Sequence, residues 1–473
     1  MLPTPVEAPA LVKVNADLAE LLGLDPADLA TPEGVAVFAG LAVPEGAEPI
    51  ALAYAGHQFG HFSPQLGDGR AILLGEVVGR DGLRRDIQLK GSGPTPFSRR
   101  GDGRAALGPV LREYIVSEAM AALGIPTTRA LAAVSTGEHV LREEPLPGAV
   151  LVRVAASHVR VGTFQFFAAR GDAEAVRVLA DYVIDRHYPQ AREADNDYVA
   201  LLDLVIARQA ALIARWMHVG FIHGVMNTDN MSIAGETIDY GPCAFMDDYN
   251  AGQVYSSIDH QGRYAFANQP AIGQWNLARF AETLLPLIAS DQNLAVKIAT
   301  DMIERFPVPF VVAYAPGLTR KIGILNVGVV REDVTLVEDL LGLMAAASAD
   351  YTLTFRRLAD AETSGAASDE VKSMLGGGDA AATWLSRWRA RLAGEAGNAG
   401  TRRALMRAAN PLYIARNHLV EEALAAATAS GDLRPFDELV AVLQHPFDEQ
   451  PGKERFATPP RADQIVHATF CGT

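Results

Sequence analysis

The stretch from His223 to Gly241, HGVMNTDNMSIAGETIDYG, constrains this chain more than any other. It places a His-Gly pair, an adjacent Asp229-Asn230 pair and an Asp239-Tyr240-Gly241 triplet within nineteen residues. The turn formers Ala234-Gly235-Glu236 divide its second half into two strand-like pieces. A polar loop before a hairpin turn would explain the pattern, since Asn, Asp and Gly all favour turns. Amide and carboxylate oxygens at neighbouring strand ends are also the ligands that Mg²⁺ prefers.

The order of these residues matches a scheme found in kinase-like phosphotransferases. Those enzymes place a catalytic loop, HRDxxxxN or HGDxxxxN, before a hairpin that ends in a metal-binding Asp-Phe-Gly. Asn230 and Asp239 take the positions of the two magnesium ligands, whereas Val225 takes the position of the usual catalytic aspartate. The outline is therefore kinase-like without the usual base, and Asp229 stands directly before the asparagine instead.

Bulk properties exclude several classes of function. The 473 residues are 49% hydrophobic and carry a net charge of −15, which suits a large core and disfavours binding to nucleic-acid phosphates. The sequence lacks the run of about 18 apolar residues that a membrane span requires. Its start lacks the basic flank and apolar core of a secretory signal. Because only two cysteines occur, Cys243 and Cys471, we expect a cytoplasmic protein. Nothing in the sequence demands a dimer, so we expect a monomer.

The predicted elements change in character along the chain. Strands and Gly-rich turns dominate residues 65–90, a helix follows from about Pro109, and residues 149–157 read as another strand. Helical patterns take over from about Thr163. A flexible connection is expected at residues 365–379, where GGGD occurs, followed by helices and a Pro-rich tail.

This order predicts an α+β fold with two lobes like those of a protein kinase: a β-rich N-terminal lobe, a helical C-terminal lobe and a helical C-terminal extension. We expect residues 1–160 to form the N-terminal region and the nucleotide-binding lobe. Residues 161–345 are expected to form the helical lobe with the catalytic and metal-binding loops, and residues 346–473 the extension and tail.

Lys90 ends an apolar strand, where a charged side chain is unexpected unless it has a specific partner. A lysine at such a position can hold a nucleotide phosphate and can be steadied by a carboxylate from a helix. Glu113 is the preferred partner because it lies on one stripe of the next helix, although Glu118 also lies beside apolar neighbours. A strand-end lysine in solvent is the alternative.

Glycines and arginines gather on both sides of that lysine. The motif GDGR occurs at residues 67–70 and again at residues 101–104. Glycines let backbone amides approach phosphate and arginine supplies charge, whereas one such motif alone would suit a tight turn. Arg153 lies within an apolar strand, where an unpaired charge is costly, and Arg160 follows it. Such a charge demands either a carboxylate of the protein or a ligand phosphate.

Long blocks of the sequence resemble the SelO family, the selenoprotein O or YdiU-like pseudokinases. The resemblance spans nearly the whole chain and is specific to that family. It rests on YAGHQFGHFSPQLGDGR (54–70), QLKGSGPTPFSRRGDGRAALGPVLREYIVSEAM (88–120), HGVMNTDNMSIAGETIDYGPCAFMDDY (223–249), NQPAIGQWNLARFAETLLPL (268–287) and NPLYIARNHLVEEAL (410–424).

The resemblance implies a protein-kinase-like fold that binds ATP in a flipped orientation. It implies transfer of AMP, rather than phosphate, to Ser, Thr or Tyr hydroxyls of proteins, the chain itself included. It implies that Lys90 pairs with Glu113, that Asp229 accepts the proton, and that Asn230 and Asp239 bind Mg²⁺ or Mn²⁺. The residues implied for nucleotide binding are Gly67, Gly69, Arg70, Lys90, Asp102, Gly103, Arg153, Arg160 and Asp239.

Two other functions stay open. The HGxxxxxN outline favours an ordinary kinase-like phosphotransferase, and Val225 in place of the base favours a nucleotide-binding scaffold without catalysis. The chain departs from the family at its end, where members often carry Sec or Cys near a Ser-rich terminus and this chain reads Phe470-Cys471-Gly472-Thr473. A regulatory Cys243–Cys471 disulfide is one hypothesis, and two independent reduced thiols are the alternative.

Overall fold

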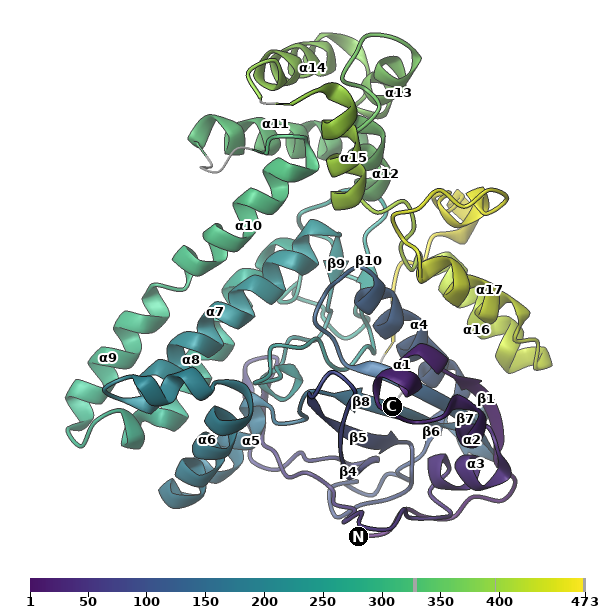
Figure 1. Cartoon of the computed structure of the whole chain (residues 1–473), viewed down its shortest axis with the longest axis vertical. Helices are drawn as coiled ribbons and strands as arrows, with labels where there is room; N and C mark the ends of the chain where they lie inside the picture. Colours follow the sequence, from purple (N-terminus) through teal and green to yellow (C-terminus); the bar gives the residue numbers. More distant parts are fainter. Residues whose placement is uncertain (326–329, 396, 471–473) are drawn as a thin grey trace.

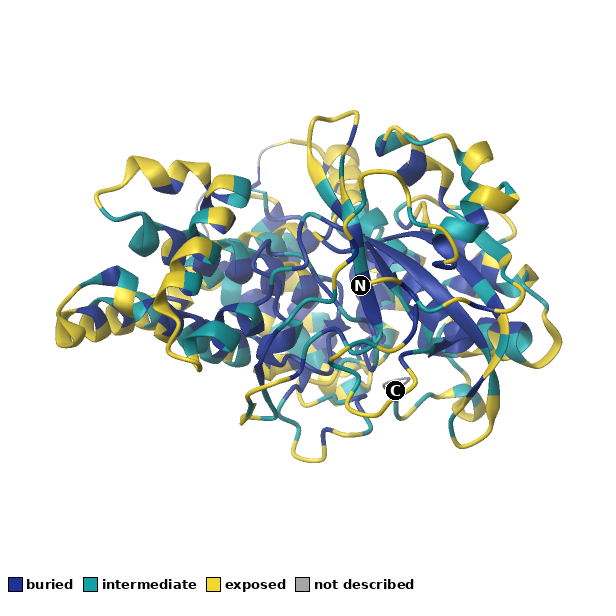
Figure 2. Ribbon diagram, turned by 90° about the horizontal axis from the view of Figure 1, so that it is seen from below, coloured by how far each residue is buried: buried dark blue, intermediate teal, exposed yellow. Residues whose placement is uncertain are grey.

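An antiparallel sheet organises the N-terminal part of the chain. The computed structural model describes residues 1–325, 330–395 and 397–470. The sheet has six strands in the order β1-β7-β8-β5-β4, with β6 paired to β8. Its strands are β1 (Ala10–Val14), β4 (Ala71–Val78), β5 (Arg84–Lys90), β6 (Ala105–Ala106), β7 (Arg129–Leu141) and β8 (Pro145–Ala155). Figure 2 shows the central strands as buried, in agreement with their runs of Val, Leu and Ala.

The register between β5 and β8 brings two cations to one face of the sheet. Gln88 lies opposite Arg153, and Lys90 lies opposite Leu151. Because side chains two residues apart share a face, Lys90 and Arg153 project to the same side from neighbouring strands. The long helix α4 (Leu107–Ala122) packs on that side and is buried along most of its length.

Three short helices cover the opposite face. They are α1 (Ala16–Leu21), α2 (Pro26–Leu29) and α3 (Pro32–Phe38). Leu18 and Phe38 from these helices form a separate apolar cluster with Val150 and Val152 of β8. The sheet is thus covered on both faces, and the alternation of side chains along β8 divides its residues between two cores.

Helices dominate the chain after the sheet (Figure 1). The first group is α5 (Val161–Ala168), α6 (Ala173–His187), α7 (Asp197–His218), α8 (Gln269–Ile288), α9 (Gln292–Glu304) and α10 (Pro307–Lys321). The second group is α11 (Arg331–Ala347), α12 (Tyr351–Leu358), α13 (Ala366–Met374), α14 (Gly378–Leu392), α15 (Ala399–Ala409), α16 (Asn417–Ser430) and α17 (Arg434–Leu443). The mixture of a sheet with many helices agrees with the predicted mixed fold class.

Two strand pairs lie apart from the main sheet. The hairpin of β2 (Gly56–Gln58) and β3 (His61–Ser63) precedes the sheet strand β4. The pair of β9 (Phe221–Ile222) and β10 (Ala244–Phe245) brackets the His223–Gly241 stretch. That stretch is expected to contain two strand-like pieces, but in the structure Ser232 and Thr237 form only isolated bridges around the turn.

The prediction of a flexible connection at residues 365–379 is wrong for most of that range. Ala366–Met374 forms α13, and α14 begins at Gly378. Val371 and Ser368 of α13 are buried, so an apolar contact with the neighbouring helices stabilises a segment whose composition suggested a linker. Helix α10 and strand β7 were not predicted; α10 begins with proline, which suits a first turn, but contains a second proline at Pro316.

The C-terminal helices return to the N-terminal part of the chain. Figure 1 shows α16 and α17 beside α4. Arg112 of α4 forms an ion pair with Glu421 of α16, with 3.2 Å between Nη1 and Oε1. Beyond α17, the Thr469 hydroxyl donates to the Pro242 carbonyl over 2.7 Å. The tail therefore lies against the loop that follows Gly241, and Cys471 lies outside the described residues.

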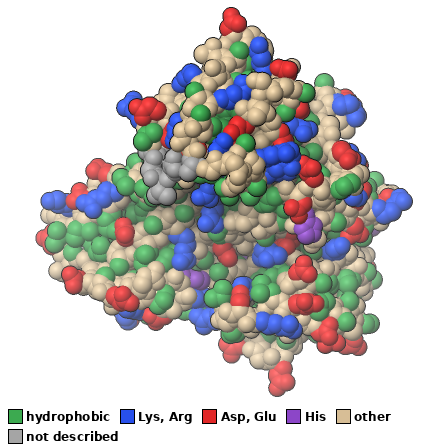
Figure 3. Space-filling view, turned by 45° about the horizontal axis from the view of Figure 1, so that its top comes forward, with side chains coloured by type: hydrophobic (Ala, Val, Ile, Leu, Met, Phe, Trp, Pro, Cys, Tyr) green, Lys and Arg blue, Asp and Glu red, His purple; other side chains and the backbone are tan. Residues whose placement is uncertain are grey.

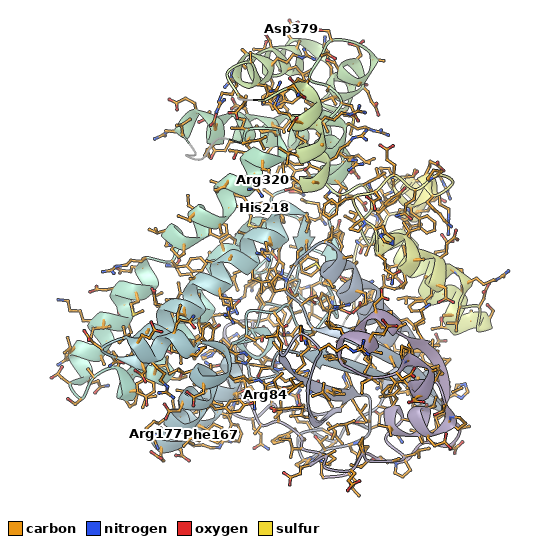
Figure 4. The ribbon with its side chains drawn as sticks, in the orientation of Figure 1. Arg84, Phe167, Arg177, His218, Arg320 and Asp379 are labelled. Carbon is orange, nitrogen blue, oxygen red and sulfur yellow. The ribbon has the colours of Figure 1, made fainter. Side chains whose placement is uncertain are left out.

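A buried lysine lies where α7 and α10 end. His218 and Arg320, labelled in Figure 4, mark these two helix ends and line the same cavity. The neighbouring Lys321 is 2% exposed, and its Nζ lies 4.3 Å from the centroid of the Phe355 ring. Burial lowers the pKa of Lys321 from 10.5 to about 7. The aromatic ring offsets part of the cost of burying that amine.

Acidic and basic side chains are interspersed over the face drawn in Figure 3. In the part of the chain that the structure describes, no helix is long and apolar enough to cross a membrane.

Candidate active site

Four charged side chains form one partly buried network between the sheet, α4 and the loop that ends the His223–Gly241 stretch. The Lys90 ammonium lies 2.6 Å from a carboxylate oxygen of Glu113 and 2.8 Å from one of Asp239. Arg153 donates from Nε to Glu113 over 2.8 Å, and its Nη2 lies 3.0 Å from Asp239. Each carboxylate thus faces both cations. The network joins strands β5 and β8 to α4 and to the Asp-Tyr-Gly loop.

The network fixes the charge of its carboxylates. Burial alone would raise the pKa of Asp239, but Lys90, Arg153 and Arg160 hold that pKa well below its ordinary value. The pKa of Glu113 is lowered in the same way, because Arg153 and Lys90 outweigh its burial. Asp239 also adopts a left-handed backbone with φ of 68°, an uncommon conformation outside glycine that often marks a functional residue.

Arg160 extends the network to the backbone at Asp229. It precedes α5, is 2% exposed, and donates from Nη1 to the backbone carbonyl of Asp229 over 2.7 Å. The same nitrogen lies 3.4 Å from Asp239, and the guanidinium lies 4.6 Å from the centroid of the Tyr54 ring. The sequence left open whether Arg153 and Arg160 face carboxylates of the protein or a ligand. In the structure both arginines contact carboxylates, and both line the same cavity.

Asp229 is held in a short 3₁₀ turn, Thr228–Asn230, and is only 6% exposed. Its Oδ2 accepts a hydrogen bond of 3.1 Å from Gln58 Nε2, and its Oδ1 has no hydrogen-bond partner among the described residues. Burial raises the pKa of Asp229 to about 6, and the Gln58 hydrogen bond and the nearby Arg160 oppose that rise. A carboxylate with one oxygen unengaged and a pKa near neutrality is suited to accept a proton.

The β2–β3 hairpin covers this turn. His57 donates from its backbone to the Thr228 hydroxyl over 2.7 Å, and Phe59 donates from its backbone to Asn227 over 3.1 Å. Gly56 approaches so closely that a Cβ there would lie 2.6 Å from Asp229 Oδ1. Gln58 was missed as a residue of the site because no periodic pattern in the sequence indicates this contact.

The remaining residues of the opening motif are arranged around the same loop. His223 is buried, with Nε2 3.0 Å from the Ile238 carbonyl, and so ties the two ends of the stretch together. Asn230 donates from Nδ2 to the Val225 carbonyl over 3.0 Å, which directs its amide oxygen away from that bond. Val225 is buried and lines a cavity with Asn230 and Asp239.

The two GDGR motifs lie on one side of the network. Gly67, Gly69, Arg70, Asp102 and Gly103 all line the cavity that Arg153 and Arg160 also line. Asp102 forms an ion pair of 2.8 Å with Arg142. Gly103 has φ of +66°, and a Cβ there would lie 2.1 Å from the backbone of Gly93, so this position excludes other residues.

Two cavities meet at the network. One, of about 450 Å³, has mainly apolar walls that include Ala105, Val110, Leu146, Leu151 and Val225. The other, of about 580 Å³, is lined by many cations, namely Arg70, Lys90, Arg99, Arg100, Arg104, Arg142, Arg153 and Arg160. Arg70, Lys90 and Asp239 line both. The site therefore offers an apolar compartment and a cationic compartment on either side of one ion network.

Two residues near this site have roles that the sequence did not reveal. Glu118, the other candidate for Lys90, instead pairs with Arg129 over 2.6 Å. Arg112, beside Glu113, donates from Nε to the Gly241 carbonyl over 3.1 Å and also donates to the Cys243 carbonyl. It fixes α4 to the backbone that follows Asp239.

Comparison with known proteins identifies the family. A family model described as protein adenylyltransferase SelO matches residues 2–444. The chain belongs to the SelO family. A relative from Rhizobium etli, named protein nucleotidyltransferase YdiU, is 62% identical over 471 residues, which are 100% of this chain and 94% of that protein. A protein of the same name from Rhodopseudomonas palustris is 61% identical over 471 residues, 100% of this chain and 95% of that protein.

These findings confirm the predicted family and the predicted enzyme class, a nucleotidyltransferase. The matched range includes the four residues of the ion network. It also includes every described residue that lines the two cavities except Phe470.

Proposed function

We propose that this chain transfers AMP from ATP to Ser, Thr or Tyr hydroxyls of proteins and releases pyrophosphate. The observation that carries the proposal is the partly buried network of Lys90, Glu113, Arg153 and Asp239, which lies beside Asp229 and lines an apolar and a cationic cavity. A nucleoside triphosphate has the matching two-part chemistry, an apolar base and an anionic polyphosphate.

The division of the cavities supports a flipped nucleotide. The base occupies the apolar cavity beside Val110 and Leu151, and the polyphosphate extends past Lys90 into the cationic cavity. Arg153 and Arg160 come from the end of β8 and from the residue before α5. Both line the cationic cavity, and guanidinium groups there favour phosphate over an apolar base.

The chemistry then follows from the positions of the groups. The acceptor hydroxyl oxygen attacks the α-phosphorus, its proton passes to Asp229, and the bond from the α-phosphorus to the bridging oxygen breaks. Pyrophosphate leaves with that electron pair. Arg70, Arg153 and Arg160 are placed to stabilise its charge in a partly water-excluded cavity, where fixed cations act strongly. Lys90 positions the phosphates, and Glu113 positions Lys90.

A divalent cation fits the residues present. Among the described residues no three His, Cys, Asp or Glu side chains are grouped as a metal site, so the protein alone does not enclose an ion. Mg²⁺ commonly takes one or two protein oxygens and completes its shell with phosphate and water. Asn230 and Asp239, which line the same cavity, would hold it. When bound, Mg²⁺ or Mn²⁺ would neutralise phosphate charge.

The wider architecture supports a kinase-like division of labour. The sheet with α4 corresponds to an N-terminal lobe (residues 1–160), α5 to α10 and nearly all of α11 to a helical lobe (161–345), and the remaining helices to an extension (346–473). The partners are ATP and proteins with accessible hydroxyls, including the chain itself. The protein is proposed to act as a cytoplasmic monomer that binds neither nucleic acid nor membranes.

Labelled ATP tests the proposal. The purified chain and a mixed protein extract are incubated with ATP labelled at the α-phosphate and, separately, at the γ-phosphate. AMP transfer predicts α-label on protein that disappears in Asp239→Ala and in Asp229→Asn. Asp203→Asn, an exposed change on α7, is the matched control and retains transfer. Label from the γ-phosphate would indicate phosphorylation, and no label at all on any protein would refute catalysis.

A further inference from the structure

A turn on the rim of the cationic cavity has an unusual backbone. The amide of Gly101 donates to the carbonyl of Ser98 over 2.7 Å and closes a turn around Arg99 and Arg100. These two central residues have φ of 47° and 75°. Positive φ at both central positions is the signature of a type I′ turn, which sequences normally satisfy with Asn-Gly or Gly-Gly. Two consecutive arginines are a strained choice, because a side chain in this region meets its own backbone.

The turn is fastened to the glycine-rich motif at residues 67–70. The Thr95 hydroxyl donates to the Asp68 carbonyl, and the Ser98 hydroxyl donates to the Gly69 carbonyl. The Thr95 amide donates to the Ser98 hydroxyl over 2.7 Å. The strained backbone is therefore held by its surroundings and placed against the first GDGR motif, which lines the same cavity.

The two arginines carry uncompensated charge. Both are exposed, both line the cationic cavity, and neither makes a hydrogen bond or an ion pair through its side chain with any described residue. Other cations of that cavity already face carboxylates, for example Arg142 with Asp102 and Arg104 with Glu138. Strain that persists in a well-held turn, together with two unengaged guanidinium groups over a cavity, points to an anionic ligand.

We propose that Arg99 and Arg100 bind the outer phosphates of the bound nucleotide and stay bound to pyrophosphate as it leaves. The ligand class is a pyrophosphate group, either as the β- and γ-phosphates of a nucleoside triphosphate or free. Guanidinium groups suit this task because they bind phosphate oxygens in pairs. The inference rests on the proposed function for the presence of a triphosphate. The new element is that Arg99 and Arg100, which lie outside the Lys90–Glu113 network, select for that triphosphate.

Direct binding of inorganic pyrophosphate to the full chain tests this, measured by calorimetry with and without Mg²⁺. Arg99→Ala and Arg100→Ala are each expected to weaken pyrophosphate binding about tenfold, the loss of one charged hydrogen-bonding group. Binding of AMP, which lacks the outer phosphates, should change less than twofold. Arg80→Ala, an exposed arginine in the turn between β4 and β5, is the control for loss of one positive charge and should leave pyrophosphate binding unchanged.

A second variant separates the ligand contact from folding. Arg100→Gly removes the guanidinium but suits the positive φ, so it should weaken pyrophosphate binding as Arg100→Ala does and raise the melting temperature. Pyrophosphate binding within twofold of wild type in both Arg99→Ala and Arg100→Ala overturns the inference, as does an equal loss of AMP binding. Failure of the wild-type chain to transfer α-label would refute the proposed function instead, and leaves this binding result readable by itself.

Discussion

Substitution of Gly56 by alanine tests the proposed role of Asp229 as proton acceptor. The added Cβ would lie 2.6 Å from Asp229 Oδ1 and 3.0 Å from Asp229 Cβ. The oxygen contact is about 0.8 Å shorter than an ordinary van der Waals contact, so either the hairpin or the aspartate must shift by that order. Gly56 begins β2, and the backbone of His57 and Phe59 is hydrogen-bonded to Thr228 and Asn227. The side chain of Asp229 is therefore the part freest to move.

A displacement of this size has a calculable effect. A misplacement of about 1 Å in a reacting group costs roughly a hundredfold in rate. We therefore expect Gly56→Ala to lower kcat for AMP transfer by about 50- to 100-fold. Overpacking typically costs about 1–3 kcal/mol, so the variant should fold with a modestly lower melting temperature. The atoms nearest to the added methyl group all belong to Asp229 and not to the arginines that line the cationic cavity, so the Kd for ATP should stay within about twofold of wild type.

The assay is single-turnover transfer of label from α-labelled ATP to protein, alongside ATP binding and thermal unfolding. Gly342→Ala is the matched control. Gly342 lies in α11, and a Cβ there meets no atom within 4 Å. It should raise stability by up to about 1 kcal/mol through helix propensity and leave transfer unchanged. Transfer by a folded Gly56→Ala protein within threefold of wild type would refute the placement of Asp229 as the proton acceptor.

Three further outcomes are expected. Arg153→Met should lower the free energy of unfolding by about 3–5 kcal/mol in urea titrations, because it leaves Glu113 and Asp239 less compensated, whereas the exposed Arg84→Met should change it by no more than about 1 kcal/mol. Lys321→Met should stabilise the chain by roughly 1–4 kcal/mol at pH 7, with an advantage that shrinks as the pH rises toward 10. The difference shrinks because the pKa of Lys321 is lower in the folded chain than in the unfolded chain. Between pH 7 and 10.5 only the unfolded chain keeps this proton, so the stability of the wild type rises with pH. A stability difference between the two proteins that stays constant with pH would contradict this prediction. Thr469→Val should free the tail from Pro242 and increase its cleavage by proteases without a change in global melting; unaltered cleavage would mean that this hydrogen bond does not hold the tail.

Several residues of the candidate site could be predicted from the sequence because they lie at positions with a strong local pattern. Lys90 ends an apolar strand, Glu113 follows on the next helix, and Asp239 sits in a recognisable triplet, so their meeting in one network follows from the layout. The Gln58–Asp229 contact joins residues 171 apart in the chain and belongs to a three-residue strand with no periodicity. No local rule could have joined them.

The turn at Arg99 and Arg100 shows a second kind of limit. Sequence rules assign positive φ to Gly, Asn and Asp, so a pair of arginines gives no sign of the conformation that the surrounding hydrogen bonds impose. Helix α13 shows a third. Its Gly- and Ser-rich flanks suggest a linker, and only the burial of Val371 against other helices makes the segment helical.

The C-terminal helices and tail pack against α4 and the loop after Asp239, and this packing has a consequence for biosynthesis. Glu421 supports Arg112, which holds the backbone after Asp239, and Thr469 anchors the carbonyl of Pro242 a few bonds further along. Glu421 and Thr469 are synthesised long after the sheet and α4, and N-terminal parts of a chain generally fold first during synthesis. A nascent chain therefore cannot complete the contacts of this loop before Thr469 has left the ribosome.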